Sequence, residues 1–486
     1  MRNNSNKICF LLFIILITIS TSSIAIEEDD PEKDLVETYH HSKQPKSIKS
    51  YNQHGVDVTY SSNGVIDFNN AFFKKFGTND RTCATCHVPT EGWTITPKGA
   101  KKRFNKTKGL DPLFRPVDGA NSPLADVSTV EKRRKAYSML LNKGNIRVGI
   151  GIPADAEFEL AEVDDPYGFA SGNELSLFRR PLPTANLKFV NTVMWDARET
   201  TRSDTSTDCI FGTSTCFSPV SFDLSTQANH ATRSHAEALA DLTESERAEI
   251  LNFEMGLFNA QVKDFLAGSL RASGAKGGPN FLLNQEYYFG INDTLVGDYR
   301  TRAPFDPNVI GLYSSWQRHA TRASNFVQRA RGSIARGEIL FNSKPIQISG
   351  VAGINDDLNV AVLPGTCTTC HNTPNSGNHS TPMPLNIGVA DASRRTPDMP
   401  LYTLRNKATN ETVQTTDPGR ALLTGKWKDI GRFKGPTLRS LASRPPYFHD
   451  GSAKNLKAVV DFYNERFAIG LTDREKADLA AFLASL

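Results

Sequence analysis

The amino-acid sequence predicts a mainly α-helical protein with two similar modules and long loop insertions. The pattern Cys-x-x-Cys-His occurs twice, at residues 83–87 and 367–371, and a helical hydrophobic pattern lies upstream of each copy. Alternating apolar and polar residues, which would indicate strands, are weak around both copies. The chain has 486 residues, 39% of them hydrophobic, so it is long enough for two or three domains.

The first half of the chain contains two predicted helices. The spacing of apolar residues predicts a helix over 66–76 that leads directly into the first Cys-x-x-Cys-His motif. Thr243 and Glu246 form a capping box, and the apolar positions that follow, from 250 to 265, predict a long amphipathic helix. Residues 269–310 are rich in Gly, Pro and Asn, which predicts an ordered loop between the modules.

The second half repeats this arrangement. A helix is predicted over 334–341, with a loop over 342–365 before the second motif. Apolar residues at i, i+3, i+4 and i+7 share one face of a helix over 456–463. A second capping box, Thr472 to Glu475, opens a final helix that we expect to pack across the C-terminal module.

The first 60 residues precede the modules. Arg2 and Lys7 come before an apolar run that ends in small residues at Ala25, which predicts a cleaved signal peptide over 1–25, too short to span a membrane. Residues 26–60 are predicted to be a flexible leader, acidic and then rich in Lys and Ser. The formal net charge of +4 gives no global field that points to nucleic acid. We therefore expect an exported protein that does not span the membrane.

Cysteine spacing carries the most specific chemical signal. Cys83, Cys86 and His87 form the first motif, and Cys367, Cys370 and His371 form the second. This is the attachment pattern of c-type haem, in which the two thiols add to the haem vinyl groups and the histidine supplies the proximal iron ligand. A four-thiolate zinc site or a redox dithiol are the alternatives. The sequence thus predicts two covalently bound haem c groups.

A third cysteine pair lies between the haem motifs. Cys209 and Cys216 bracket six residues and have no adjacent histidine. In an oxidising compartment they are most simply a disulfide that closes a small loop.

Three segments, together with the haem motifs, carry a family resemblance. They are Met194–Glu199, with Trp-Asp-Ala-Arg, then Phe433–Arg439, and Pro446–Ser452, with Tyr-Phe-His-Asp-Gly-Ser. The chain resembles the bacterial di-haem cytochrome c peroxidase and MauG family from about residue 66 to the end. The resemblance implies two cytochrome c-like haem modules: a peroxidatic domain around haem 1 over 61–310 and an electron-transfer domain around haem 2 over 311–486.

The chain also departs from the small peroxidases. The stretch between His87 and Trp195 is much longer, and the Cys209/Cys216 loop is an addition, both features of larger relatives that include rubber oxygenases. Small members bind calcium partly through an Asn before a Pro, where this chain has Arg180, so calcium is doubtful here. Lys98–Lys108 is a basic run that we interpret as a solvated face, with docking of an acidic electron donor as the alternative.

The resemblance implies roles for residues around haem 1. The next histidine after His87 is His230, so the nearby distal histidine of many family members has no counterpart, and haem 1 is expected to be five-coordinate. The family places an acid/base shortly after a Gln-Ala pair. Counting from Gln227 gives Glu237, with His235 as the competitor; surface positions are the alternative for both.

Two further roles follow from the resemblance. Trp195 is similar to the tryptophan that relays electrons between the haems, with core filling as the alternative, and His449 of the third segment is expected to be structural or to tune a haem. The distal ligand of haem 2 lies fourteen residues beyond that histidine, at Tyr463. MauG has tyrosine there and small peroxidases have methionine. The competing ligands are His379, Met383 and Met399.

The sequence therefore predicts a periplasmic di-haem c-type peroxidase that reduces hydrogen peroxide at haem 1. Electrons are expected to come through haem 2 from a small periplasmic donor such as a cytochrome c or a cupredoxin. Tyr463 makes MauG-like oxidation of a partner plausible, because an anionic oxygen ligand favours ferric or higher iron. The alternatives are a rubber-oxygenase-like dioxygenase and a non-enzymatic two-haem electron carrier.

Overall fold

The computed structural model describes residues 44–486, so the predicted signal peptide and the start of the predicted leader lie outside the described residues. Helices make up 31% and strands 17% of the structure, in several sheets. The prediction of a mainly α-helical protein is therefore wrong. Some of the strands pair with segments about 200 or more residues away in the chain, which local periodicity does not reveal.

Residues 47–269 contain a four-stranded antiparallel sheet in the order β1-β2-β6-β7. Its strands are β1 (Ser47–Tyr51), β2 (Gly55–Ser61), β6 (Leu257–Asp264) and β7 (Gly268–Ser269). β1 and β2 come from the predicted leader, and β2 pairs with β6 about 200 residues later, Thr59 opposite Asn259. The end of the predicted leader is thus part of the folded body.

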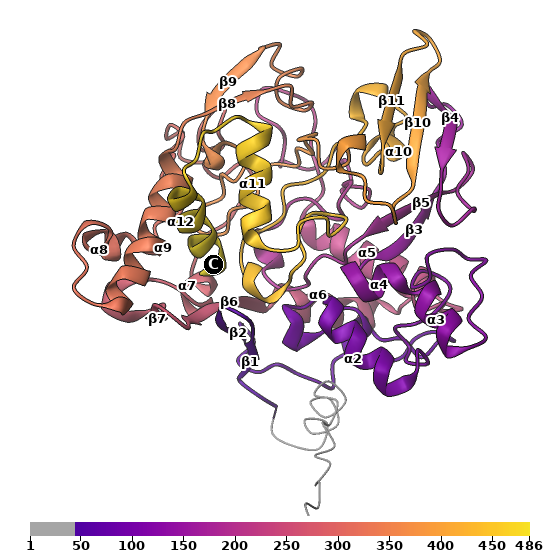
Figure 1. Cartoon of the computed structure of the whole chain (residues 1–486), viewed down its shortest axis with the longest axis horizontal. Coiled ribbons are helices and arrows are strands. Elements are labelled where there is room, and N and C mark those ends of the chain that lie inside the picture. Colours follow the sequence, from indigo (N-terminus) through magenta and orange to yellow (C-terminus); the bar gives the residue numbers. More distant parts are fainter. Residues whose placement is uncertain (1–43) are drawn as a thin grey trace, which may run out of the picture.

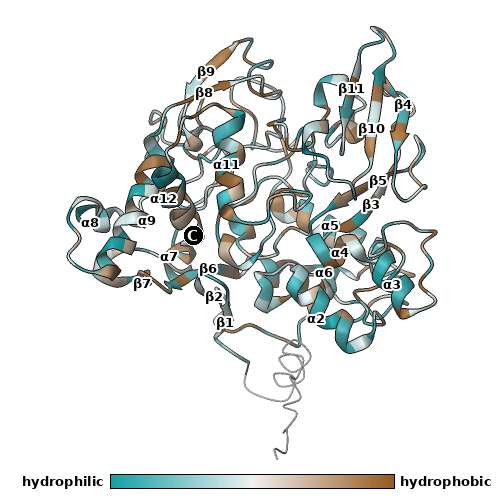
Figure 2. Cartoon of the chain, in the orientation of Figure 1, coloured by the Kyte–Doolittle hydropathy of each residue, from teal (hydrophilic) through white to brown (hydrophobic). Residues whose placement is uncertain are grey.

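The helices of the first half surround the first motif. They are α2 (Pro97–Thr107), α3 (Val130–Ala136), α4 (Ser138–Lys143), α5 (Val220–Ser234) and α6 (Glu244–Met255). In Figure 2, α2 and α3 are largely hydrophilic in colour, and most α2 side chains are at least partly exposed. The basic run therefore lies on a solvated helix, as the sequence predicts.

Two predicted helices of this half differ from the structure. Over 66–76 there is only a short 3-10 turn, Ala71–Phe73. The backbone N–H of Asn69 donates to Asp67 and that of Phe72 to Asn70, and such local side-chain bonds compete with an α-helix. The helix that begins after the Thr243 capping box ends at Met255, and the apolar residues beyond it form β6.

The second half is built on two packed helices, α9 (Phe326–Ser343) and α12 (Asp473–Ala484). The other elements are α7 (Pro279–Leu283), α8 (Gln317–Thr321), α10 (Ala421–Thr424) and α11 (Leu456–Arg466), with the hairpin β8 (Ile346–Ser349) and β9 (Val362–Gly365). α9 covers the predicted helix over 334–341. The Thr472 capping box is formed, so the predicted final helix is confirmed.

Strands from the two halves also combine into one sheet. β4 (Phe158–Asp164) pairs with β10 (Leu401–Asn406), which pairs with β11 (Thr412–Thr415). This sheet projects at the upper right of Figure 1 and lies next to a two-stranded antiparallel sheet of β3 (Ile146–Ile150) and β5 (Leu175–Arg179). The long insert after the first haem motif is therefore anchored to the C-terminal half of the chain.

Candidate haem sites

The first Cys-x-x-Cys-His motif lines a cavity of about 190 Å³. Cys83 begins a 3-10 turn that a Thr82–Thr85 capping box fixes, and Cys83, Cys86 and His87 all lie in the cavity wall. Nδ1 of His87 lies 3.2 Å from the carbonyl oxygen of Trp93. This hydrogen bond leaves Nε2 free, the arrangement that orients a metal-ligating histidine.

The second motif repeats the same local structure at a second cavity, of about 220 Å³. A Thr366–Thr369 capping box fixes the turn that begins at Cys367, and Cys370 and His371 complete the wall. Nδ1 of His371 lies 2.6 Å from the carbonyl oxygen of Gly377. The two cysteine pairs line different cavities, so they do not make one four-thiolate zinc site.

Burial sets the protonation of these groups. It lowers the pKa of His87 and of His371 to about 4, so both imidazoles are neutral at pH 7, as metal ligands must be. Burial also raises the pKa of the Cys367 and Cys370 thiols to about 12. Thiols that remain protonated in an apolar wall are inert as free redox cysteines, which argues against the dithiol alternative.

The wall shared by the two cavities contains buried cations. Arg180 and Lys434 line both cavities, and Arg444 lines the second. They donate to backbone carbonyls, Lys434 to that of Thr192, and none of the three forms an ion pair with a carboxylate of residues 44–486. Burial, followed by repulsion from Arg444, lowers the pKa of Lys434 to about 7.

These observations test whether haem fits the two cavities. Haem needs two thiols and an imidazole at fixed spacing, apolar walls for the macrocycle, and cations for its two propionates. Each cavity provides the first two, and the shared wall provides uncompensated cations. The residues present therefore fit one haem c in each cavity, held by Cys83, Cys86 and His87 in the first and by Cys367, Cys370 and His371 in the second.

The predicted distal residues of haem 1 do not all reach the first cavity. Gln227 on α5 and His235 just beyond its end both lie in the cavity wall. Glu237 does not; its backbone has φ of 56°, and its carboxylate accepts a hydrogen bond from Asn79 at 2.9 Å. The structure thus brings Gln227 and His235 together with the first motif.

Trp195 lies in the wall between the two cavities and lines both of them. Its indole Nε1 donates to the carbonyl oxygen of Arg180 at 2.7 Å, and its own carbonyl oxygen accepts from the backbone N–H of Lys434 at 2.8 Å. These bonds fix the ring between the two sites.

Three of the four candidate ligands of haem 2 line the second cavity. Tyr463, His379 and Met383 line the second cavity, whereas Met399 packs in a core cluster with Met139. The Tyr463 side chain is partly buried, and its hydroxyl forms no hydrogen bond with another of the residues 44–486. Nε2 of His379 is also buried without a partner. Tyr463 and His379 therefore both offer a free ligand atom.

Two more titratable residues, His449 and Glu254, line the cavities. His449 lines the second cavity, stacks on Phe433 with 4.2 Å between ring centroids, and has no hydrogen bond at either ring nitrogen. Glu254 on α6 lines the first cavity, and burial raises its pKa to about 8. Sequence reasoning missed Glu254, although its place one turn after Ile250, on the apolar face of the helix, was a signal.

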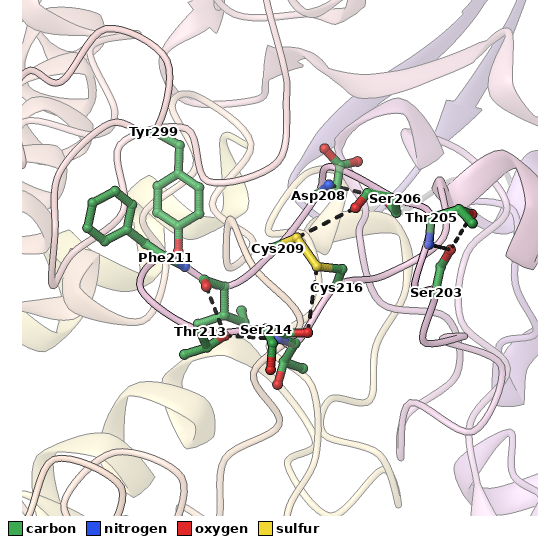
Figure 3. The surroundings of a disulfide bond; sticks show 12 residues. Ser203, Thr205, Ser206, Asp208, Cys209, Phe211, Thr213, Ser214, Cys216 and Tyr299 are labelled. Carbon is green, nitrogen blue, oxygen red and sulfur yellow. Dashed lines mark hydrogen bonds between the residues drawn. A yellow bond between two sulfur atoms is a disulfide. The ribbon is translucent and has the colours of Figure 1, made fainter.

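The third cysteine pair lies apart from the haem motifs. The sulfur atoms of Cys209 and Cys216 lie at bonding distance in an exposed loop, and the backbone N–H of Phe211 donates to the Tyr299 hydroxyl at 2.9 Å (Figure 3). Neither cysteine lines either large cavity. The pair is therefore placed to staple the loop, as the sequence predicts.

Part of the chain is similar in sequence to curated proteins. No family model matches. Cytochrome-c peroxidase IdrP2 of Denitromonas iodatirespirans is 33% identical over 132 residues, 25% of this chain and 36% of that protein. Cytochrome-c peroxidase IdrP1 of Pseudomonas sp. (strain SCT) is 27% identical over 210 residues, 39% of this chain and 48% of that protein. The chain thus spans about half or less of these curated relatives.

One solved structure aligns with most of the chain. It is the crystal structure of a MauG-like protein associated with microbial copper homeostasis. The alignment covers 86% of both chains at 16% identity, with a TM-score of 0.36. Among residues 44–486, no helix is long and apolar enough to cross a bilayer. The curated relatives are named cytochrome-c peroxidases, and over the part of the chain that they match they support the family resemblance carried by the haem motifs and the three segments.

Proposed function

We propose that this protein is a periplasmic di-haem c-type peroxidase that reduces hydrogen peroxide at the first cavity with electrons delivered through the second. One observation carries the proposal: each Cys-x-x-Cys-His motif lines a cavity of its own, and Trp195 lines both. A single-haem peroxidase has no need of the second site. The relatives named cytochrome-c peroxidase support the same reaction type.

The first cavity supplies the proton chemistry. A haem bound in this cavity would supply an iron that binds peroxide and the electrons that cleave the O–O bond. Peroxide cleavage also needs a group that removes one proton and returns it to the leaving oxygen. Both His235 and Gln227 line the cavity, which supports assigning this transfer to His235 and a hydrogen bond to peroxide to Gln227. The hydrogen bond from His87 to Trp93 orients the proximal ligand.

Glu254 is the competing acid/base at the first cavity. Its pKa of about 8 keeps the carboxyl protonated at pH 7, so it would act as a proton donor rather than as a base. The first step with neutral peroxide is proton removal, which favours His235. The choice between the two is open to direct test.

The second site passes electrons onward. We propose that a small cytochrome c or cupredoxin reduces the second haem, with Tyr463 as its distal ligand. The indole of Trp195 is an oxidisable ring fixed between the sites, which suits a relay. A phenolate ligand favours ferric or higher iron, so the second haem would help to store oxidising equivalents for MauG-like oxidation of a partner.

A second candidate function is a rubber-oxygenase-like dioxygenase. The apolar residues Val190, Val193 and Leu224 in the wall of the first cavity favour it, because an apolar substrate needs such a surface. A dioxygenase would form a stable complex of ferrous haem with dioxygen. The peroxidase is preferred because the predicted electron path through Trp195 gives the second site a function.

The test is stopped-flow absorbance of the purified protein mixed with peroxide, in the oxidised and half-reduced forms. His235→Ala should slow the reaction by about 10² or more, and Glu254→Gln should leave it within about tenfold. The matched control is His230→Ala, because His230 is exposed, pairs with Glu199 and does not line the cavity. Two six-coordinate irons that are inert to peroxide would instead show an electron carrier.

A further inference from the structure

His235 contacts a buried carboxylate, that of Asp118, which no motif in the sequence singles out. Nδ1 of His235 is 2.6 Å from Oδ2 of Asp118. The Asp118 side chain is 5% exposed and does not line the first cavity, whereas His235 does. It comes from the long insert between the first haem motif and Trp195.

Arg81 forms an ion pair with Asp118. Its guanidinium lies 2.7 Å from each Asp118 oxygen, and its side chain is 2% exposed. The pKa of Asp118 is lowered to about 2 because the attraction of Arg81 and the His235 hydrogen bond together outweigh burial. Asp118 is therefore ionised at pH 7 and can only accept hydrogen bonds.

The contact fixes the His235 ring. An ionised carboxylate accepts, so the hydrogen lies on Nδ1 and the lone pair of the neutral ring lies on Nε2. The backbone is held as well, because the carbonyl oxygen of His235 accepts from Asn79 Nδ2 at 2.8 Å and from Arg81 Nη1 at 3.0 Å. With the ring and the carbonyl both held, His235 has one orientation at the cavity wall.

We propose that Asp118 is a positioning residue for His235: with Arg81 it holds the imidazole in the tautomer that presents a basic Nε2 to the first cavity. The proposal rests on the proposed role of His235 in the peroxidase reaction. A carboxylate behind a catalytic histidine fixes the tautomer and stabilises the imidazolium after proton uptake. The alternative is a buried ion pair that only stabilises the fold.

Ligand binding separates these two roles. Hydrogen cyanide must lose its proton as it binds ferric haem, so its association rate reports on a base in the cavity. Carbon monoxide binds ferrous haem without proton transfer, so its rate reports on access and packing alone. A positioning role predicts a change with cyanide and peroxide only, and a structural role predicts similar changes with all three.

The experiment uses the holoprotein and a double-mutant cycle of Asp118→Asn and His235→Ala. Asp118→Asn should slow cyanide and peroxide by about 10 to 10² while the carbon monoxide rate stays constant. In the His235→Ala background it should have no further effect on cyanide. The matched control is Asp111→Asn, since Asp111 forms a similar bidentate pair with Arg103, outside the cavity lining.

Two outcomes would overturn the proposal: an equal loss of cyanide rate in both backgrounds, or a parallel loss of the carbon monoxide rate. If Asp118→Asn does not fold because Arg81 is left unpaired, Arg81→Met with Asp118→Asn removes both charges and should show the same cyanide effect. If the wild-type protein does not react with peroxide, the proposed function fails. The cyanide cycle then still decides whether Asp118 positions His235.

Discussion

Lys434 is the most informative single substitution in the shared wall. Its ammonium lines both cavities and has no carboxylate partner among residues 44–486. In the protein wall alone, its pKa falls from 10.5 to about 7, mainly through burial, a difference worth about 5 kcal/mol. A charge so costly to bury is expected to meet an anion, and the propionates of the two haems are the anions that fit.

The expected effect is on the reduction potentials. A buried positive charge disfavours ferric iron, so Lys434→Met should lower the potential of both haems. At an effective dielectric of about 20 and a separation of about 10 Å, one charge contributes about 1.7 kcal/mol, or roughly 70 mV. Lys428→Met is the control, because Lys428 is 59% exposed and solvent screens its charge.

The pH dependence decides whether propionates are the partners. If haem propionates pair with the Lys434 ammonium, the ammonium stays charged. The difference in reduction potential between wild type and Lys434→Met should then persist from pH 6 to about pH 9 in spectroelectrochemical titrations. If no propionate pairs with it, Lys434 loses its proton near pH 7, and the difference in reduction potential should disappear above that pH. If the difference in reduction potential disappears above pH 7, or if Lys434→Met does not shift the potentials at pH 6, the propionates are not the partners of Lys434.

Three other predictions concern attachment, relay and ligation. Cys83→Ala should halve the covalent haem content measured as pyridine haemochrome, and full loading would contradict the attachment. Trp195→Phe should slow electron transfer between the haems by about tenfold or more, a rise of about 1.4 kcal/mol in the barrier, whereas Trp316→Phe should not, because Trp316 is buried and lines neither cavity. Tyr463→Met should raise the potential of the second haem by about 0.1 V or more; an unchanged potential and spectrum would point to His379.

Local signals in the sequence predicted the parts of the fold that depend on local interactions. Both capping boxes, at Thr243 and Thr472, are formed, because each is completed within four residues. The helical face over 456–463 is also as predicted: Leu456, Val459, Val460 and Tyr463 all line the second cavity. Such elements need no information from distant parts of the chain.

The sheets could not be predicted in the same way. β4 pairs with β10, Leu401 opposite Asp164, across more than 200 residues, and no local pattern fixes that partner. The helix expected over 66–76 failed for a related reason. Its apolar side chains do enter a core, with Phe68 and Phe72 fully buried, but along a turn rather than a helix. The pattern correctly marked burial and misassigned the backbone.

The distal site shows the same limit of counting along a sequence. A fixed offset from Gln227 selects Glu237, yet α5 ends at Ser234 and the chain then turns through a positive φ at Glu237. That turn directs Glu237 toward Asn79 and leaves His235 in the cavity wall. An offset transfers a residue's role only where the backbone between the two positions is the same.

The segments that carry the family resemblance converge at one place in the structure. The carbonyl oxygen of His449 accepts from the backbone N–H of Arg180 at 2.6 Å, and Trp195 bonds to both Arg180 and Lys434. These segments therefore build the junction between the two sites, which any member that moves electrons from one haem to the other requires. Asp118, in contrast, comes from the insert that departs from the small peroxidases, and its carboxylate contacts His235 in the wall of the first cavity. The insert is therefore where we expect the chemistry particular to this protein.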